Sequence, residues 1–522
     1  MDRSKSILWV DDEIDLLRPH IILLQQRGYM VETATNGEDA LTLAQSNHYG
    51  LVFLDESMVG MSGLDTLLGL KLQDASRPVV MVTKNEQESI MDEAIGRKID
   101  DYLTKPVNPA QILAACKKFL EAKKIVEQKF TQTYFQGFNE ISQRLNDNLT
   151  WNDWLDIYQK LVGWSMELDT HPELGFAQTL NDQWRECNRI FSRFVEKNYA
   201  DWLTDKPKEG NPLLSPHILD EFVLPRVKKA KHTIFFVVDC MRLDQWLVME
   251  EFLRPLFNVT KSYYSGILPT ATPYARNSIF SGLYPADIAK HYPQWAPDES
   301  RDEHSQNAHE KDLLGAYLKR KFVELNNDLQ YIKIIDTDFG KKIENDITRI
   351  AKNHFTAVVV NAMDMIAHSR SDYAILKEIA PDESAYRSLT RSWFQHSSLY
   401  GMLRTLAGMK DVNIVITTDH GSVRCLHGVK ALGDRDTSTC LRYKMGRNVK
   451  ADDKNAMQIK NPAQYRLPQT SMTTNMIIAK EDYYFVYPTD FNHYLSKYRD
   501  SFQHGGISLE EMILPVVILE QR

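Results

Sequence analysis

The stretch "VNIVITTDHGS", residues 412–422, is an almost unbroken run of apolar and β-branched residues that ends in Asp419 and His420. A continuous run of this kind predicts a strand that is buried on both faces, as the strands of parallel sheets are. Two more runs, "TIFFVVD" at 233–239 and "AVVV" at 357–360, have the same character and also lead to acidic residues. We therefore expect a parallel sheet, with acidic and histidine side chains gathered at the carboxyl ends of its strands.

Six residues in this part of the chain are candidate metal ligands. Asp364 and His368 are four residues apart, so on a helix both side chains would lie on one face and could chelate one ion. Taken singly, an aspartate at a strand end is often a helix cap, and a histidine before glycine is often a turn residue. Together, three carboxylates and three imidazoles form a set that suits Zn²⁺. The six residues are Asp239, Asp364, His368, Asp419, His420 and His504.

A threonine stands directly before a proline in "LPTATPYARNSIFSG", residues 268–282, where Thr272 and Pro273 precede a helical pattern. One interpretation is structural, because threonine is a good N-cap and proline suits the first helical position. The other is chemical, because a helix N-terminus favours anions such as phosphate, which the hydroxyl could attack. Arg276, one turn further on, could reach the same phosphate or form an exposed salt bridge, and Asn277 is a weaker candidate.

Residues 1–120 show an alternation of strand and helix patterns. Five short apolar runs are each followed by a segment with helical spacing, which predicts a parallel, doubly wound (βα)5 sheet of the flavodoxin-like type. The runs are "ILWV" at 7, "MVETAT" at 30, "LVFLD" at 51, "PVVMVT" at 78 and "DYLTKP" at 101.

Polar residues stand at the carboxyl ends of these runs. Asp11 and Asp12 follow the first run, and Asp55 ends the third. Three carboxylates at one edge repel each other unless a hard cation lies between them, and Mg²⁺ prefers oxygen ligands. Asp55 could then accept a phosphoryl group, while Lys105 neutralises one phosphoryl oxygen and Thr83 hydrogen-bonds another.

This arrangement resembles the response-regulator receiver domain over residues 1–120. The resemblance implies that a sensor histidine kinase is the partner that leads to phosphorylation of Asp55. One departure is Val59 in "DESMVGMSG", where receivers usually have a proline. The further roles that the resemblance implies are Mg²⁺ ligands (Asp11, Asp12 and Asp55), a switch pair (Thr83 and Lys105) and an aromatic switch position (Tyr102).

The segment 121–210 has a helical pattern throughout. Five tryptophans recur with apolar residues at helical intervals, which is more typical of a packed core than of a cofactor site. The stretch 205–216 is rich in proline and glycine and indicates a boundary. We therefore expect a receiver domain at 1–120, a helical bundle at 121–210 and a second α/β domain at 211–522. The tryptophans are Trp151, Trp154, Trp164, Trp184 and Trp202.

The candidate residues of the C-terminal region resemble, in identity and order, those of the alkaline-phosphatase superfamily, in particular its PglZ branch. The resemblance implies an alkaline-phosphatase-like α/β fold, with Thr272 facing two zinc ions as the nucleophile. A receiver joined through a helical region to a PglZ domain also resembles response regulators associated with type IX secretion. The implied ligands are Asp364, His368 and His504 for the first zinc, and Asp239, Thr272, Asp419 and His420 for the second.

Charge and cysteine content limit the classes of function. The net charge of -8 argues against a broad nucleic-acid-binding surface. Five cysteines, an odd number without CxxC spacing, fit a reducing compartment. No apolar stretch is long enough for a signal peptide or a membrane span, so we expect a cytoplasmic protein without membrane insertion.

The combined expectation is a two-component response regulator with a zinc-dependent phosphodiesterase domain. The resemblance implies cyclic or linear oligonucleotides as substrates, two Zn²⁺ in this domain and Mg²⁺ in the receiver. A phosphomonoesterase is one alternative. Another is a signalling adaptor with a structural zinc site, in which phosphorylation exposes a surface for a secretion-system or transcription partner. Receivers commonly signal through a paired interface, so we expect a homodimer on phosphorylation.

Overall fold

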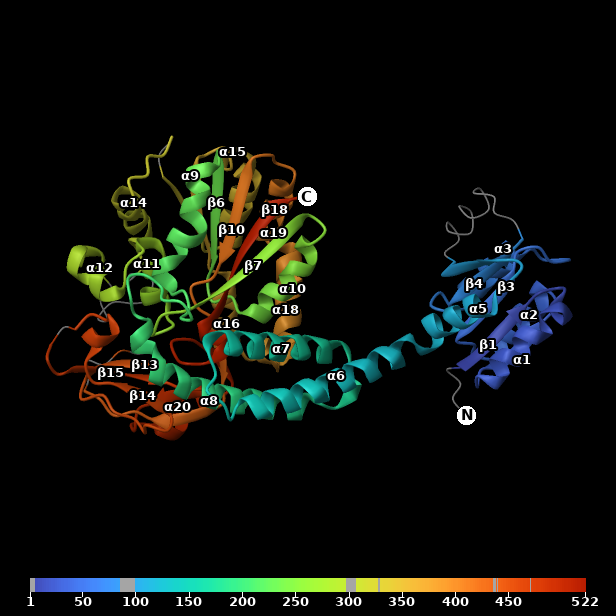
Figure 1. Cartoon of the computed structure of the whole chain (residues 1–522), viewed down its shortest axis with the longest axis horizontal. Helices are drawn as coiled ribbons and strands as arrows, with labels where there is room; N and C mark the ends of the chain where they lie inside the picture. The colour runs from blue at the N-terminus through green and yellow to red at the C-terminus, as the bar shows by residue number, and fades with distance from the viewer. Residues whose placement is uncertain are drawn as a thin grey trace. The chain divides into compact units, whose positions relative to one another are not determined.

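The chain divides into two compact units, Met1–Phe135 and Gln136–Arg522, which are described separately (Figure 1). The computed structural model describes residues 5–84, 99–296, 307–326, 329–434, 438, 440–469 and 471–522. Among these residues, no helix combines the length and the apolar character needed to cross a membrane.

The first unit contains a five-stranded parallel sheet in the order β2-β1-β3-β4-β5. Every apolar run that was predicted to be a strand in residues 1–120 is one, so the predicted (βα)5 fold is confirmed. The strands are β1 (Ser6–Val10), β2 (Met30–Ala34), β3 (Leu51–Asp55), β4 (Val79–Thr83) and β5 (Asp101–Thr104).

Apolar layers cover both faces of this sheet because successive side chains of each strand point in opposite directions. Ile7 and Trp9 belong to one layer, and Leu8 and Val10 belong to the other. The helical segment expected after β4 falls on residues 85–98, outside the described residues. The described helices of the sheet are α1 (Arg18–Gln26), α2 (Gly37–Ser46), α3 (Gly63–Gln73) and α5 (Pro109–Cys116).

Three long helices follow: α6 (Ala122–Arg144), α7 (Trp151–Thr170) and α8 (Ala177–Trp202). A capping box between Thr150 and Asp153 fixes the start of α7, since each residue bonds the backbone N–H of the other. Four of the five tryptophans are buried, as a core role predicts, whereas Trp184 is half-buried. Helices α7 and α8 belong to the second unit.

The centre of the second unit is a six-stranded sheet in the order β7-β18-β10-β6-β9-β8 (Figure 1). The three predicted strands are its neighbouring members β10, β6 and β9, and they are parallel. At one side β18 pairs antiparallel with β10 and β7, so the sheet is mixed. The strands are β6 (His232–Val238), β7 (Phe257–Ser265), β8 (Gln330–Ile334), β9 (Phe355–Val360), β10 (Val412–Thr417) and β18 (Ile513–Gln521).

Helices cover both faces of this sheet, as its near-continuous apolar strands require. One apolar layer includes side chains from α10 (Leu243–Leu253), α15 (Thr337–Ile350), α18 (Glu383–His396) and α19 (Ser398–Ala407). The opposite layer includes side chains from α9 (Leu224–Lys229), α11 (Thr272–Ser281), α12 (Pro285–His291) and α14 (Glu310–Arg320).

The remaining elements lie around the carboxyl edge or in smaller sheets. The helices are α16 (Ala362–Asp372), α17 (Ala374–Ile379), α20 (Phe491–Tyr498) and α21 (Leu509–Met512). The strands are β11 (Val423–Cys425), β12 (His427–Lys430), β13 (Tyr443–Arg447), β14 (Ala456–Ile459), β15 (Thr474–Ala479), β16 (Tyr483–Val486) and β17 (Ser501–Gln503).

Candidate metal centres

The carboxyl edge of the six-stranded sheet gathers the six candidate ligands of the second unit into two groups. Asp239 follows β6, Asp419 follows β10, and Asp364 lies on α16, which begins after β9. Within each group, one ligand atom from every residue lies within 4.8 Å of the others. The first cluster consists of Asp364, His368 and His504. The second cluster consists of Asp239, Asp419 and His420.

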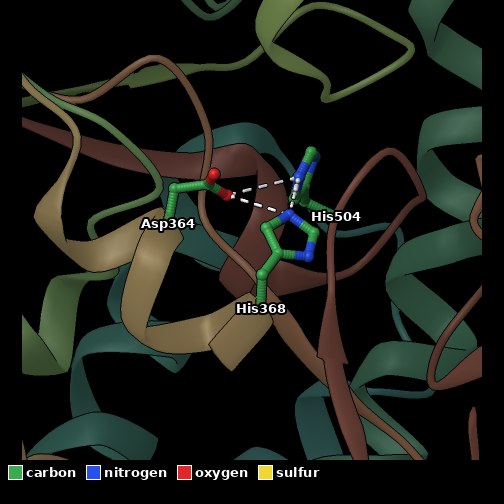
Figure 2. Close-up of side chains that lie close together, drawn as sticks. All are labelled: Asp364, His368 and His504. Atoms are coloured by element: carbon green, nitrogen blue, oxygen red, sulfur yellow. Dashed lines mark hydrogen bonds and ion pairs between the residues drawn. The ribbon is translucent and has the colours of Figure 1, made fainter. Parts of the chain in front are cut away.

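The first cluster combines one helix with a distant loop (Figure 2). His368 Nε2 lies 3.3 Å from Asp364 Oδ1, and His504 Nε2 lies 3.5 Å from the same oxygen. The two Nε2 atoms are 3.4 Å apart. Burial opposes ionisation of Asp364, but its contacts with the imidazoles of His368 and His504 hold the pKa of its carboxyl well below the usual range. An ionised carboxylate and two imidazoles facing one point suit a zinc ion.

The second cluster contains buried carboxylate oxygens that lack hydrogen-bond donors. Asp419 Oδ1 accepts the backbone N–H groups of Cys240 at 3.2 Å and His420 at 3.1 Å. Among the described residues, no hydrogen bond reaches Asp419 Oδ2 or Asp239 Oδ1. Burial, together with the charge of Asp419, raises the pKa of Asp239 well above its usual range, although Arg276 opposes this shift. Buried charges of this kind need a partner, so a divalent cation fits the cluster.

Arg276 lies among these carboxylates. Its Nη1 is 2.6 Å from Asp239 Oδ2 and 3.6 Å from Asp419 Oδ2, and its Nε is 2.5 Å from Glu310 Oε1. The side chain is buried, so the expectation of an exposed salt bridge is wrong. Glu310, at the start of α14, was not predicted, because no local pattern links it to a residue on α11. Asn277 is also buried and donates to the carbonyl of Pro273 in its own helix, at 2.8 Å.

Thr272 is the first residue of α11, and the N-cap is Ala271, which has an extended backbone. The interpretation of Thr272 as the N-cap is therefore wrong. Its Oγ1 lies 2.9 Å from His420 Nε2 instead. His420 Nδ1 lies 3.1 Å from the carbonyl oxygen of Gly421, which places the ring proton on Nδ1 and leaves Nε2 as the acceptor. Burial lowers the pKa of His420, which favours this neutral form.

The two clusters lie side by side. The rings of His420 and His504 are stacked, with centroids 4.2 Å apart and an interplanar angle of 20°. Gly421 permits the close packing of this edge, since a Cβ there would lie 1.9 Å from the carbonyl oxygen of Glu510. The loop after His504 has φ of +114° at Gly505, which only glycine adopts readily. The arrangement can hold two adjacent cations beside one buried hydroxyl.

The first unit has its own acidic cluster. One oxygen from each of Asp11, Asp12 and Asp55 lies within 4.8 Å of the others. Lys105 Nζ lies 2.7 Å from Asp11 Oδ2 and 2.9 Å from Asp55 Oδ2. Burial raises the pKa of Asp55, although its contact with Lys105 opposes that shift. The all-oxygen set fits Mg²⁺.

Thr83 and Tyr102 were also predicted from the sequence. Thr83, at the end of β4, donates its hydroxyl hydrogen bond to Glu56. Glu56 was not predicted, and its position directly after Asp55 is the signal that could have found it. Tyr102, on β5, is 42% exposed.

Comparison with known families defines the class of protein. Residues 7–117 match the model of the response regulator receiver domain, and residues 124–203 match that of the PorX response regulator linker domain. Residues 218–519, more than half of the chain, match the BREX system PglZ alkaline phosphatase-like domain. The chain therefore belongs to the PglZ alkaline-phosphatase-like family and carries a response regulator receiver.

Individual relatives are similar to only a part of this chain. The alginate biosynthesis transcriptional regulatory protein AlgB of Pseudomonas putida is 36% identical over 124 residues, 24% of this chain and 28% of that protein. The alkaline phosphatase synthesis transcriptional regulatory protein PhoP of Bacillus subtilis is 33% identical over 124 residues, 23% of this chain and 51% of that protein. This chain thus spans between 28% and 51% of the length of these two relatives.

Among solved structures, chemotaxis protein CheY4 of Vibrio cholerae is 29% identical and covers 22% of this chain and 98% of its own, with a TM-score of 0.21.

Proposed function

We propose that this chain is a response regulator that is phosphorylated on Asp55 and whose PglZ domain is a zinc-dependent phosphodiesterase. The observation that carries the proposal is the contact of the Thr272 hydroxyl with His420 at the junction of two ligand clusters. A threonine that only began a helix would not need to lie there. We propose domain boundaries at 1–120, 121–210 and 211–522.

Two zinc ions would be held by the first and second clusters, and Mg²⁺ by the receiver cluster. When bound, the zinc ions would lower the pKa of a nearby hydroxyl and neutralise charge that develops on phosphate oxygens. The chain itself would supply the nucleophile and the orientation of the phosphate.

Thr272 would release its hydroxyl proton to solvent water, and its Oγ1 would form a bond to phosphorus. The bond between phosphorus and the leaving alcohol then breaks, and the alcohol takes up a proton. Water afterwards attacks the phosphothreonine ester, which breaks the Oγ1–P bond and regenerates the hydroxyl. The backbone N–H of Thr272, the first residue of α11, would bind a phosphate oxygen, because Pro273 has no N–H and the N–H groups of Tyr274 and Ala275 donate to Ala271 O. Arg276 would oppose protonation of Asp239, and Arg276 and Asn277 remain predictions as phosphate contacts.

The proposed substrates are phosphodiesters such as cyclic or linear oligonucleotides, and the proposed process is the regulation of type IX secretion. Both follow from the resemblance of the domain order to response regulators of that system. A net charge of -8 favours short substrates over long nucleic acids. A sensor histidine kinase would control the receiver, phosphorylation would produce a homodimer, and a secretion-system or transcription partner would receive the signal.

The test is turnover of bis-p-nitrophenyl phosphate and of its monoester by metal-free protein with and without added zinc. We expect zinc-dependent cleavage that is faster for the diester and is abolished by a chelator. Faster cleavage of the monoester would indicate the phosphomonoesterase alternative. Two bound zinc ions without turnover of either compound would indicate the adaptor alternative.

A further inference from the structure

Helix α8 contacts both segments that carry the candidate site. Asn188, Ser192 and Tyr199 are buried on the helix and bond to backbone groups of the PglZ domain. The sequence predicted only a core role for this helical region. These contacts reach the loop after His504 and the segment before Thr272.

Asn188 makes a two-sided contact with the start of α21, which directly follows the loop that carries His504. Its Oδ1 accepts the backbone N–H of Leu509 at 2.8 Å, and its Nδ2 donates to Glu510 Oε2 at 3.0 Å. The indole of Trp184, one turn earlier on α8, donates to the other oxygen of Glu510. One amide thus satisfies a buried donor and a buried acceptor, and both would be left unpaired without it.

The same loop is tied to the segment that leads to Thr272. Thr270 Oγ1 accepts the N–H of Gly505 at 3.2 Å and donates to the carbonyl of Gly506 at 2.8 Å. Tyr199, also on α8, accepts the N–H of Leu268 through its hydroxyl at 2.7 Å. Helix α8 therefore bonds to the start of α21 and to the segment before Thr272. Thr270 in turn links that segment to the loop of His504.

We propose that α8 is a positioning element for the candidate active site, with Asn188 and Tyr199 as its positioning residues. Asn188 holds the loop of His504, and Tyr199 holds the segment of Thr272. This inference rests on the proposed function of that site. A ligand works only when its side chain is held in place, and loss of an outer hydrogen-bonding partner typically costs 10- to 100-fold in metal affinity.

The apolar contacts of α8 are separate from these hydrogen bonds. Phe191 packs against Trp154 of α7, with ring centroids 5.3 Å apart, and Trp202 packs against Trp151. Cys187 and Val195 are also fully buried. Because these contacts hold the helix in place, removal of the Asn188 amide should loosen the loop more than it destabilises the domain.

The experiment compares Asn188→Ala with Asn198→Ala in the full chain. Asn198 is a matched control, because it lies on the same helix and its amide donates to Phe194 O of that helix at 2.8 Å. Hydrogen exchange of residues 504–511 is measured in metal-free protein, and zinc affinity is measured by competition with a chelator. We expect faster exchange and a loss of about 10-fold or more in the affinity for one zinc in Asn188→Ala only.

Tyr199→Phe tests the second contact, since it removes only the hydroxyl. We expect faster exchange around Leu268 and a lower kcat with unchanged zinc content and KM. If Asn188→Ala does not fold, Asn188→Ser replaces it. The shorter side chain cannot make both contacts, so exchange should rise at residues 509–511.

Exchange and zinc affinity equal to those of Asn198→Ala would overturn the role of Asn188. Exchange around Leu268 that is unchanged in Tyr199→Phe would overturn the role of Tyr199. The exchange measurements need neither zinc nor turnover. They therefore test the role of α8 even if the wild-type protein shows no phosphodiesterase activity. That result would refute the proposed function and leave the role of α8 untouched.

Discussion

The receiver and the PglZ domain both hold mutually repelling carboxylates at the same place in a sheet. In both, carboxylates converge at the carboxyl ends of parallel strands, and a basic side chain lies among them. Lys105 Nζ is within 2.9 Å of Asp11 and Asp55, and Arg276 Nη1 is 2.6 Å from Asp239. Each cation offsets the repulsion between neighbouring carboxylates in the absence of a metal.

The two sites differ in ligand type and in burial. The receiver cluster has only carboxylates, and Asp12 is exposed, which suits an exchangeable Mg²⁺. The PglZ clusters add three imidazoles, and all three ligands of the second cluster are buried. The carboxyl edge of a parallel sheet can therefore form a site for a hard cation or for a borderline one. The side chains that its loops contribute decide which.

The largest effect is expected from Thr272→Ala, which tests whether the PglZ edge is catalytic. If Thr272 is the nucleophile, turnover should fall by a factor of about 10³ or more, a barrier increase of at least about 4 kcal/mol. The folded state should survive, because Thr272 is not the N-cap of α11. The measurements are the diesterase rate of zinc-loaded protein and the melting temperature.

Thr272→Ser is the control for that variant. It keeps a hydroxyl for attack, so appreciable activity should remain. An alanine variant with wild-type turnover would remove Thr272 as the nucleophile and show that another group attacks phosphorus.

The second prediction concerns the receiver edge. With Mg²⁺ and beryllofluoride, the wild-type protein should increase in mass as it forms a dimer, whereas Asp55→Asn should remain unchanged because it lacks the acceptor carboxylate. Light scattering over a range of concentrations measures the mass. A wild-type mass that stays constant throughout would contradict the switch.

The third prediction separates the two PglZ clusters. His504→Ala removes one imidazole of the first cluster, so the protein should lose about one zinc per chain and retain the other. Elemental analysis after exhaustive dialysis measures the content, and Asn198→Ala serves as a variant outside the site. Retention of both zinc ions would remove His504 from the ligand set.

The smallest effect concerns the loss of folded-state stability that the buried Asp55 carboxylate causes when no metal is bound. Burial raises the pKa of Asp55, so the folded state keeps its proton to a higher pH than the unfolded state does. Stability therefore falls as pH rises from about 3.8 through the folded pKa. Above that range, metal-free Asp55→Asn should melt on the order of a few °C higher than wild type.

This difference should shrink at pH 4, close to the ordinary pKa of about 3.8, because little of the destabilisation has developed there. Thermal melts of metal-free protein at pH 4 and pH 7.5 provide the test. A difference that does not vary with pH would show that Lys105 already offsets the full cost of burying Asp55.

The sequence by itself determined the five strands of the receiver sheet, three strands of the six-stranded sheet (β6, β9 and β10), and the residues at the ends of these strands. Runs such as 412–417 are continuous and β-branched, and a strand buried on both faces needs that composition along its whole length. The pairing of Asp364 with His368 was also predictable, because four residues make about one helical turn. These features depend on local periodicity, which the sequence displays directly.

Only the tertiary structure decided which distant side chains meet. His504 reaches Asp364 across 140 positions of sequence, and Arg276 pairs with Glu310 across 34. The Thr-Pro pair suggested a cap, yet α11 begins at Thr272, whose hydroxyl bonds to His420. Contacts of this kind depend on how packed helices and loops are placed around the sheet, and no local pattern encodes that placement.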